Sequence, residues 1–105
     1  MKNDQRSKDK KLLKILSILF DLSQSELEIY KKLLEKKRII VSDLVSEIKY
    51  SKRTIQDSLK KLYEKGLIFR EISKKSKRMY EYYAKDPKKI LKEILKELKE
   101  LIEEE

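Results

Sequence analysis

The sequence predicts an α+β fold that is mainly α-helical, and three features of its 105 residues indicate this class. Glycine and proline occur once each and 45% of the residues are charged, which favours helices over structures with many tight turns. Apolar residues recur at helical spacing through most of the chain. Only between residues 67 and 84 does the period shorten to about two, which indicates a pair of β-strands.

The first 21 residues divide into a polar tail and an apolar helix. Residues 1–9 are hydrophilic and mixed in charge after Met1, so we expect a disordered tail. Residues 10–21 predict a helix that is apolar on nearly every face, which the body of the protein or a second chain must cover. We therefore expect an N-terminal dimerisation helix. Its contact residues would be Leu12, Ile15, Leu16 and Leu19.

The next segment predicts a helix, a short strand and a second, shorter helix. Ser23 and Glu26 have the spacing of a capping box, so the first of these helices should begin at Ser23. The β-branched residues that follow Arg38 indicate a short strand. Residues 42–48 then predict a short helix, which a three-residue turn joins to the helix described next.

Residues 51–66 predict a helix with both ends marked, Ser51 as the N-cap and Gly66 just past the C-terminus. Ile55, Leu59 and Leu62 form one apolar stripe, which should pack on the domain. An apolar back with Arg, Lys, Gln and Thr in front is what a helix needs to enter the major groove of DNA. The candidate DNA-binding residues here are Ser51, Lys52, Arg53, Thr54, Gln56, Asp57, Lys60 and Lys61. We expect Arg53 to bind guanine. The alternative is a surface pair with Asp57 one turn on, and the two can coexist because Asp57 could fix the Arg53 rotamer.

Residues 67–72 and 78–84 predict two strands joined by a polar, basic tip. A helix-turn-helix followed directly by a hairpin is a winged helix-turn-helix, and we assign residues 22–86 to it. The tip would bind phosphate through Lys74, Lys75, Lys77 and Arg78. The tyrosines at 80, 82 and 83 fit the packing of the hairpin better than base stacking.

Asp86 and Pro87 predict the start of the last helix, as N-cap and first helical residue. Apolar residues along it have the 3-4-3 spacing of a heptad seam, so residues 87–105 should form a C-terminal dimerisation helix. The candidate contact residues are Leu91, Ile94, Leu95, Leu98, Leu101 and Ile102.

The net charge is +9, and residues 49–78 hold eleven Lys and Arg against three Asp and Glu, or +8. Such segregation indicates a polyanionic partner. The chain has no cysteine and no histidine, which removes thiolate metal sites and the commonest general base. We expect no enzyme, cofactor or metal site. With no membrane-spanning segment or signal peptide indicated, we expect a cytoplasmic protein.

Four segments resemble the winged-helix transcription regulators of the TrmB-like group, which are close to the MarR-like fold. They are Leu22-Ser-Gln-Ser-Glu-Leu27-Glu-Ile-Tyr30, Val41-Ser-Asp-Leu44, Ser51-Lys-Arg-Thr-Ile55 and Leu59-Lys-Lys-Leu62-Tyr-Glu-Lys-Gly66-Leu67-Ile68. The resemblance covers about residues 21–105. It implies a DNA-binding dimer that regulates transcription, commonly in archaea, with base contacts around Lys52 to Asp57 and phosphate contacts from the hairpin. The larger regulators carry an effector domain after this region. The chain ends at Glu105, so a small-molecule effector is not indicated.

These patterns together predict a homodimeric, sequence-specific regulator that binds double-stranded DNA. Two alternatives remain open at this stage. One is an architectural DNA-binding protein of low specificity, and the other is a winged helix used for protein contacts. An enzyme would need a carboxylate or lysine site, which no spacing indicates.

Overall fold

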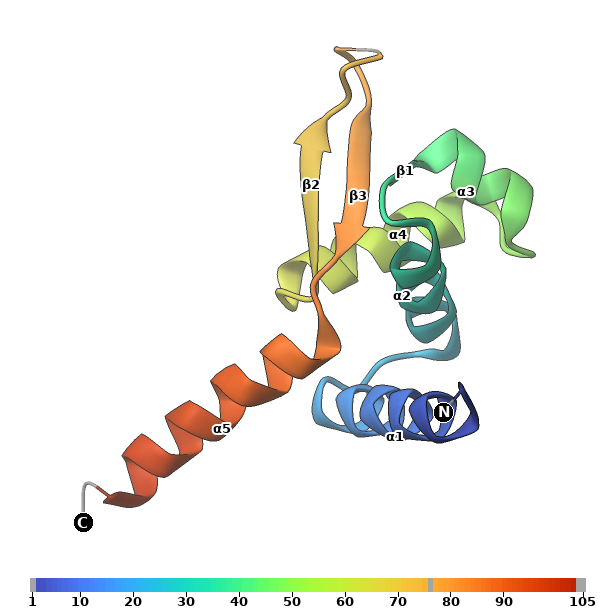
Figure 1. Ribbon diagram of the computed structural model, residues 1–105. Helices are drawn as coiled ribbons and strands as arrows, with labels where there is room; N and C mark the ends of the chain where they lie inside the picture. Colours follow the sequence, from blue (N-terminus) through green and yellow to red (C-terminus); the bar gives the residue numbers. More distant parts are fainter. Residues whose placement is uncertain (1, 76, 104–105) are drawn as a thin grey trace. The chain divides into compact units, whose positions relative to one another are not determined.

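The computed structural model describes residues 2–75 and 77–103, with the backbone alone for residues 2–8. The chain forms two compact units, one from residues 22–85 and one from the two terminal segments. Each unit is described by itself below, with the labels of Figure 1.

The central unit contains three helices and a small antiparallel sheet. Its elements are α2 (Gln24–Lys36), β1 (Ile39–Ile40), α3 (Val41–Glu47), α4 (Lys52–Glu64), β2 (Ile68–Ile72) and β3 (Tyr80–Ala84). The strand order is β1-β3-β2, so the last strand lies in the middle of the sheet. The β2–β3 hairpin with its connecting turn is called the wing below (Figure 1). The predicted α+β, mainly α class and the winged helix-turn-helix are confirmed.

Local signals set the ends of the helices as predicted. Ser23 and Glu26 form the full capping box of α2, and the Ser51 hydroxyl accepts a hydrogen bond from the Thr54 amide, at 3.1 Å, to cap α4. Gly66 has a φ of +78° and follows the last turn of α4. Around it the Leu67 amide donates to the Leu62 carbonyl and the Gly66 amide to the Tyr63 carbonyl, the pattern of a Schellman motif.

The core of the central unit lies between α2, α3 and α4. The predicted stripe of α4 is confirmed, since Ile55, Leu59 and Leu62 are fully buried. Helix α2 contributes a buried face of its own to this core. Its fully buried residues are Ile29, Tyr30 and Leu33, whereas Leu27 and Leu34 are half-buried. Tyr30 is held there because its hydroxyl donates to the Lys85 carbonyl at 2.5 Å.

The terminal unit consists of α1 (Lys2–Leu19) and α5 (Pro87–Glu103), which contact each other. The disordered tail predicted for residues 1–9 is wrong for residues 2–9, which are helical; Met1 lies outside the described residues. Lys, Gln and Arg are good helix formers, and no glycine or proline interrupts this segment, so the helix extends toward the N-terminus. The predicted start of α5 is confirmed, with the Asp86 carboxylate accepting from the Lys88 amide at 3.0 Å.

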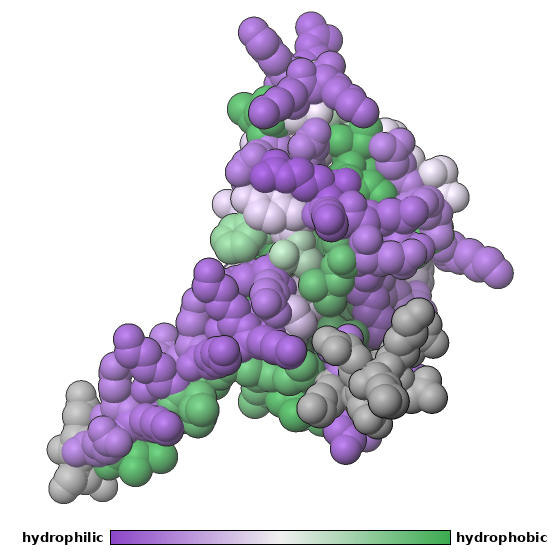
Figure 2. All heavy atoms as spheres, viewed as in Figure 1, coloured by the Kyte–Doolittle hydropathy of each residue, from purple (hydrophilic) through white to green (hydrophobic). Residues whose placement is uncertain are grey.

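Apolar side chains of the terminal unit are divided between core and surface. Leu16 is fully buried in the single chain, so it belongs to the core and is not exposed for a partner as predicted. A helix that is apolar on every face must pack one face on its own chain, and Leu16 lies on that face. Figure 2 shows apolar side chains along α5. The exposed ones of this unit are Ile15, Ile18, Leu19, Leu95, Leu98, Leu101 and Ile102, while Leu12, Leu91 and Ile94 are half-buried. Among the described residues, no helix is both long and apolar enough to cross a membrane.

Candidate nucleic-acid interface

Helix α4 presents a polar front because its apolar back is buried in the central unit. The predicted contact residues on this front are exposed, except for Thr54, which is half-buried. They are Ser51, Lys52, Arg53, Gln56, Asp57, Lys60 and Lys61. A rigid helix held by a packed back and open at the front can enter a groove of DNA without rearranging the core.

Ser51 and Thr54 form the hydrogen-bonded cap of α4. The Ser51 hydroxyl accepts from the Thr54 amide and donates to the Thr54 hydroxyl oxygen at 2.9 Å. The pair therefore fixes the first turn of the helix. The longer side chains at this end, those of Lys52, Arg53 and Gln56, are exposed.

The structure divides the front of α4 into two sides. Lys52 and Gln56 turn toward the wing, where they line a groove of about 310 Å³. The other groove residues are Val41, Ser42, Arg78, Met79, Tyr80 and Tyr82. Asp57, Lys60 and Lys61 instead border an open surface with Glu64. The sequence did not predict this division, which depends on where the wing folds against the helix.

Arg53 does not form an ion pair with Asp57, the alternative considered for its side chain. Neither side chain has an ion pair in the part of the chain that the structure describes, and both are exposed. The Arg53 guanidinium therefore keeps its donors for an external acceptor.

The tip of the wing is cationic, and hydrogen bonds of a buried serine hold its turn. Lys74, Lys75, Lys77 and Arg78, the wing-tip cations, are all exposed, and Figure 2 shows hydrophilic side chains over the tip. Ser73 is only 3% exposed. Its hydroxyl donates to Glu81 at 3.1 Å and accepts from the Lys75 amide at 3.2 Å. Sequence reasoning placed Ser73 only in the turn and missed its role in holding the tip.

One face of the wing carries a carboxylate pair that Arg38 neutralises. Glu71 and Glu81 are opposite each other in the β2–β3 register, an unfavourable position for like charges. Arg38 Nη1 lies 2.8 Å from Glu71 Oε2 and 3.7 Å from Glu81 Oε2. The Tyr83 hydroxyl also donates to Glu71 at 3.0 Å. The Arg38 guanidinium, followed by the Tyr83 hydroxyl, holds the pKa of Glu71 below its usual value.

The wing tyrosines are engaged in the packing of the hairpin. The Tyr83 ring lies 5.1 Å from Phe69, and Arg38 lies over the same ring at 4.5 Å. On the other face, Tyr80 and Tyr82 meet edge to face at 6.3 Å. These contacts support the packing interpretation of the three residues.

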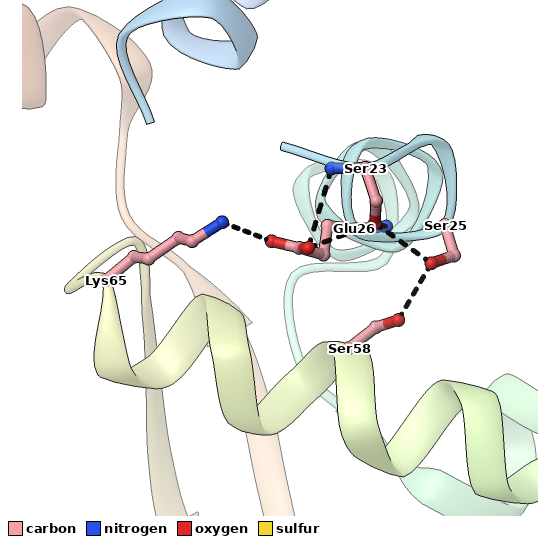
Figure 3. Close-up of polar contacts among 5 residues, drawn as sticks. All are labelled: Ser23, Ser25, Glu26, Ser58 and Lys65. Atoms are coloured by element: carbon pink, nitrogen blue, oxygen red, sulfur yellow. Dashed lines mark hydrogen bonds and ion pairs between the residues drawn. The ribbon is translucent and has the colours of Figure 1, made fainter. Parts of the chain in front are cut away.

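A polar cluster fixes α4 against α2 (Figure 3). Glu26 is 3% exposed and accepts hydrogen bonds from Lys65 at 2.8 Å and from the Ser23 hydroxyl at 3.0 Å. Ser25 and Ser58 share a second hydrogen bond between the two helices, at 2.9 Å. We call these five residues the α2–α4 clasp. It joins the first turn of α2 to the middle and the end of α4.

Burial of the Glu26 carboxylate acts to raise its pKa, but the hydrogen bonds from Lys65 and Ser23 outweigh burial and hold the pKa below its usual value. Glu26 was predicted only as a capping residue. Its bond to Lys65 spans 39 positions, so no local spacing indicates it.

Among the described residues, no cluster of three or more acidic side chains occurs that could hold a metal ion. The side chains that this surface presents are mainly exposed cations and hydrogen-bond donors.

Comparison with known proteins links this arrangement to transcription regulators. Residues 16–88 match the family described as sugar-specific transcriptional regulator TrmB. No curated protein matches the chain significantly in sequence.

Solved structures share the fold. The ST1889 protein from the thermoacidophilic archaeon Sulfolobus tokodaii is 25% identical, with a TM-score of 0.64 over 96% of this chain and 95% of that one. MarR, known from a crystal structure, is 21% identical, with a TM-score of 0.64 over 86% of this chain but only 66% of the length of MarR. Streptococcus pneumoniae FabT, solved in complex with DNA, is 18% identical, with a TM-score of 0.60 over 98% of this chain and 76% of FabT.

Proposed function

The chain belongs to the family of the sugar-specific transcriptional regulator TrmB, and from this premise we propose that it acts as a homodimer that binds specific sequences of double-stranded DNA. Helix α4 would enter the major groove, and the wing-tip cations would contact backbone phosphates. The family and the fold show that the chain is a winged-helix transcriptional regulator.

The observation that carries the proposal is the orientation of α4. Its apolar stripe is fully buried, so Arg53, Lys60 and Lys61 are held outward on a rigid helix. The exposed wing-tip cations add further positive charge. Both groups belong to residues 49–78, which carry a net charge of +8. Binding of DNA to such a surface is favoured because the cations replace the counterions of the phosphate backbone, which are released. The exposed Arg53 can then contact a base edge. FabT, a protein of the same fold, has been solved with DNA.

The homodimer is supported by the apolar residues left exposed in the terminal unit. Leu95, Leu98, Leu101 and Ile102 of α5 are each at least half exposed. Leu95, Leu98 and Ile102 follow one another at spacings of three and four residues, so they form one row along the helix. On a monomer this row would stay in water, which large apolar side chains on one helix face avoid. A second copy offers an identical row and would cover it.

The test separates sequence reading from general affinity. A preferred site is first selected from a pool of random duplexes, and affinities for that site and for random duplex are then compared. Arg53→Ala should cost about 1–3 kcal/mol on the preferred site and much less on random duplex, because its lost contact is to a base. Lys60→Ala, the matched control on the same helix, should weaken both by similar factors, since we expect it at phosphate.

Both variants should melt close to wild type, because both residues are exposed. Equal losses on the two duplexes for Arg53→Ala would favour the architectural alternative. No binding of any duplex by wild type would refute the proposal and favour the protein-interaction alternative.

A further inference from the structure

Arg70 is an exposed arginine of β2 whose side chain is held by two aromatic rings. Its guanidinium carbon lies 4.2 Å from the centre of the Tyr63 ring on α4 and 4.6 Å from that of Tyr80 on β3. Both distances are in the range of cation–π attraction. The side chain therefore has a defined position between the last turn of α4 and the wing, although it lies at the surface.

Unlike Arg38, Arg70 has no acidic partner in the described part of the chain. Arg38 also lies over a tyrosine ring, but its guanidinium forms ion pairs through Nη1 with Glu71 and Glu81 on the other face of the wing. Among the described residues, none accepts a hydrogen bond or forms an ion pair with the Arg70 guanidinium. Stacking orients a guanidinium without using its N–H donors, so a planar fork remains open to solvent.

The surroundings of this fork indicate its ligand. Arg70 is opposite Tyr82 in the β2–β3 register, so both lie on one face of the wing. Tyr80 and Tyr82 of this face line the groove described above, together with the cations Lys52 and Arg78. The acidic pair of the wing lies on the opposite face. An ordered arginine with free donors on a cationic face fits the oxygens of a phosphate, which accept the fork bidentately.

We propose that Arg70 contacts a backbone phosphate of bound duplex DNA, and that Tyr63 and Tyr80 position its guanidinium for this contact. The assignment rests on the duplex binding proposed above. It adds a phosphate contact at the root of the wing, apart from those expected at the tip.

The experiment measures duplex affinity against salt concentration for a set of variants. Arg70→Ala should weaken binding at least about tenfold on preferred and random duplex alike, as expected for loss of a bidentate, charge-assisted contact. Its log–log salt slope should be shallower by about 0.9, the value for one neutralised phosphate. Arg70→Lys keeps the charge but not the fork, so it should keep the slope and lose part of the affinity.

Substitutions of Tyr63 test whether its ring positions Arg70, because they leave the charge of the protein unchanged. Tyr63→Phe keeps the ring and should bind as wild type does, whereas Tyr63→Leu should weaken binding severalfold with the slope unchanged. Lys31→Ala, at an exposed lysine of α2 outside the proposed interface, is the control for one lost charge and should leave the slope unaltered.

Melting curves show whether each variant folds. If Arg70→Ala does not fold, Arg70→Lys and the two Tyr63 variants carry the test. A wild-type slope and affinity in Arg70→Ala, or equal effects of Tyr63→Phe and Tyr63→Leu, would show that Arg70 only braces the wing and would overturn the proposal. Failure of wild type to bind duplex would instead remove the function on which it rests.

Discussion

Replacing Lys65 by Met should destabilise the protein more than any other single change at an exposed or half-exposed lysine. Lys65 Nζ lies 2.8 Å from Glu26 Oε2, and methionine keeps the length of the side chain while removing its charge. The Glu26 carboxylate would then remain buried without its cation.

The structure sets the size of this effect. Removing one partner of a buried ion pair costs about 3–5 kcal/mol, because an uncompensated charge is left behind. The Glu26 side chain is 4% exposed, but that of Lys65 is 28% exposed, so water reaches one end of the pair. We therefore expect the lower end of the range, a decrease of about 3 kcal/mol in the free energy of unfolding.

The loss of stability in Lys65→Met should also depend on pH, and the direction of this dependence follows from the pKa of Glu26. In wild type the pKa of Glu26 is lowered, so its contribution is present above the unfolded pKa and is lost as the pH falls through the folded pKa. Without Lys65 the effect of burial dominates, and the pKa of Glu26 should rise instead. The variant can then protonate Glu26 easily, so its deficit relative to wild type should shrink as the pH falls.

Urea unfolding at one fixed protein concentration, at about pH 7 and about pH 4, measures both quantities. Lys61→Met, at an exposed lysine of the same helix, is the control and should change stability by less than about 0.5 kcal/mol. Adding Glu26→Gln to Lys65→Met should recover part of the loss, because no buried charge remains. A deficit in Lys65→Met no larger than in the control, or one that grows in acid, would refute the role given to the clasp.

Three further predictions concern the wing and the terminal unit. Changing the three wing-tip lysines to Ala together should flatten the salt slope of duplex binding by up to about 2.7, with the ranking of sequences kept; an unaltered slope would exclude the tip as a phosphate contact. Leu98→Lys combined with Leu101→Lys should convert a dimer into a monomer in sedimentation equilibrium, and wild type should be dimeric at micromolar concentration. Arg38→Met should speed hydrogen exchange of the wing, because Glu71 and Glu81 would face each other unneutralised. Since Arg38 lowers the pKa of Glu71, this protection is lost as the pH falls through the folded pKa of Glu71, so wild type and variant should converge in acid.

Local signals in the sequence determined the order of the elements and most of their ends. Ser23, Ser51 and Asp86 begin helices, and Gly66 ends α4, because caps satisfy backbone groups within a few residues of their own position. The buried stripe of α4 was equally readable, since one face of a helix repeats at a fixed period. The same reasoning started α1 too late, because polar residues with good helix propensity carry no sign that distinguishes a helix from a tail.

Only the tertiary structure decided which side chains meet. It turned Lys52 and Gln56 toward the wing, left Arg53 without Asp57, buried Leu16 in the single chain and placed Arg70 against Tyr63. It also joined Glu26 to Lys65 across 39 positions. Capping and periodicity are encoded within one or two turns of the chain. The contacts named above depend on which faces of separate elements pack together, and the spacing of residues within one element does not determine this packing.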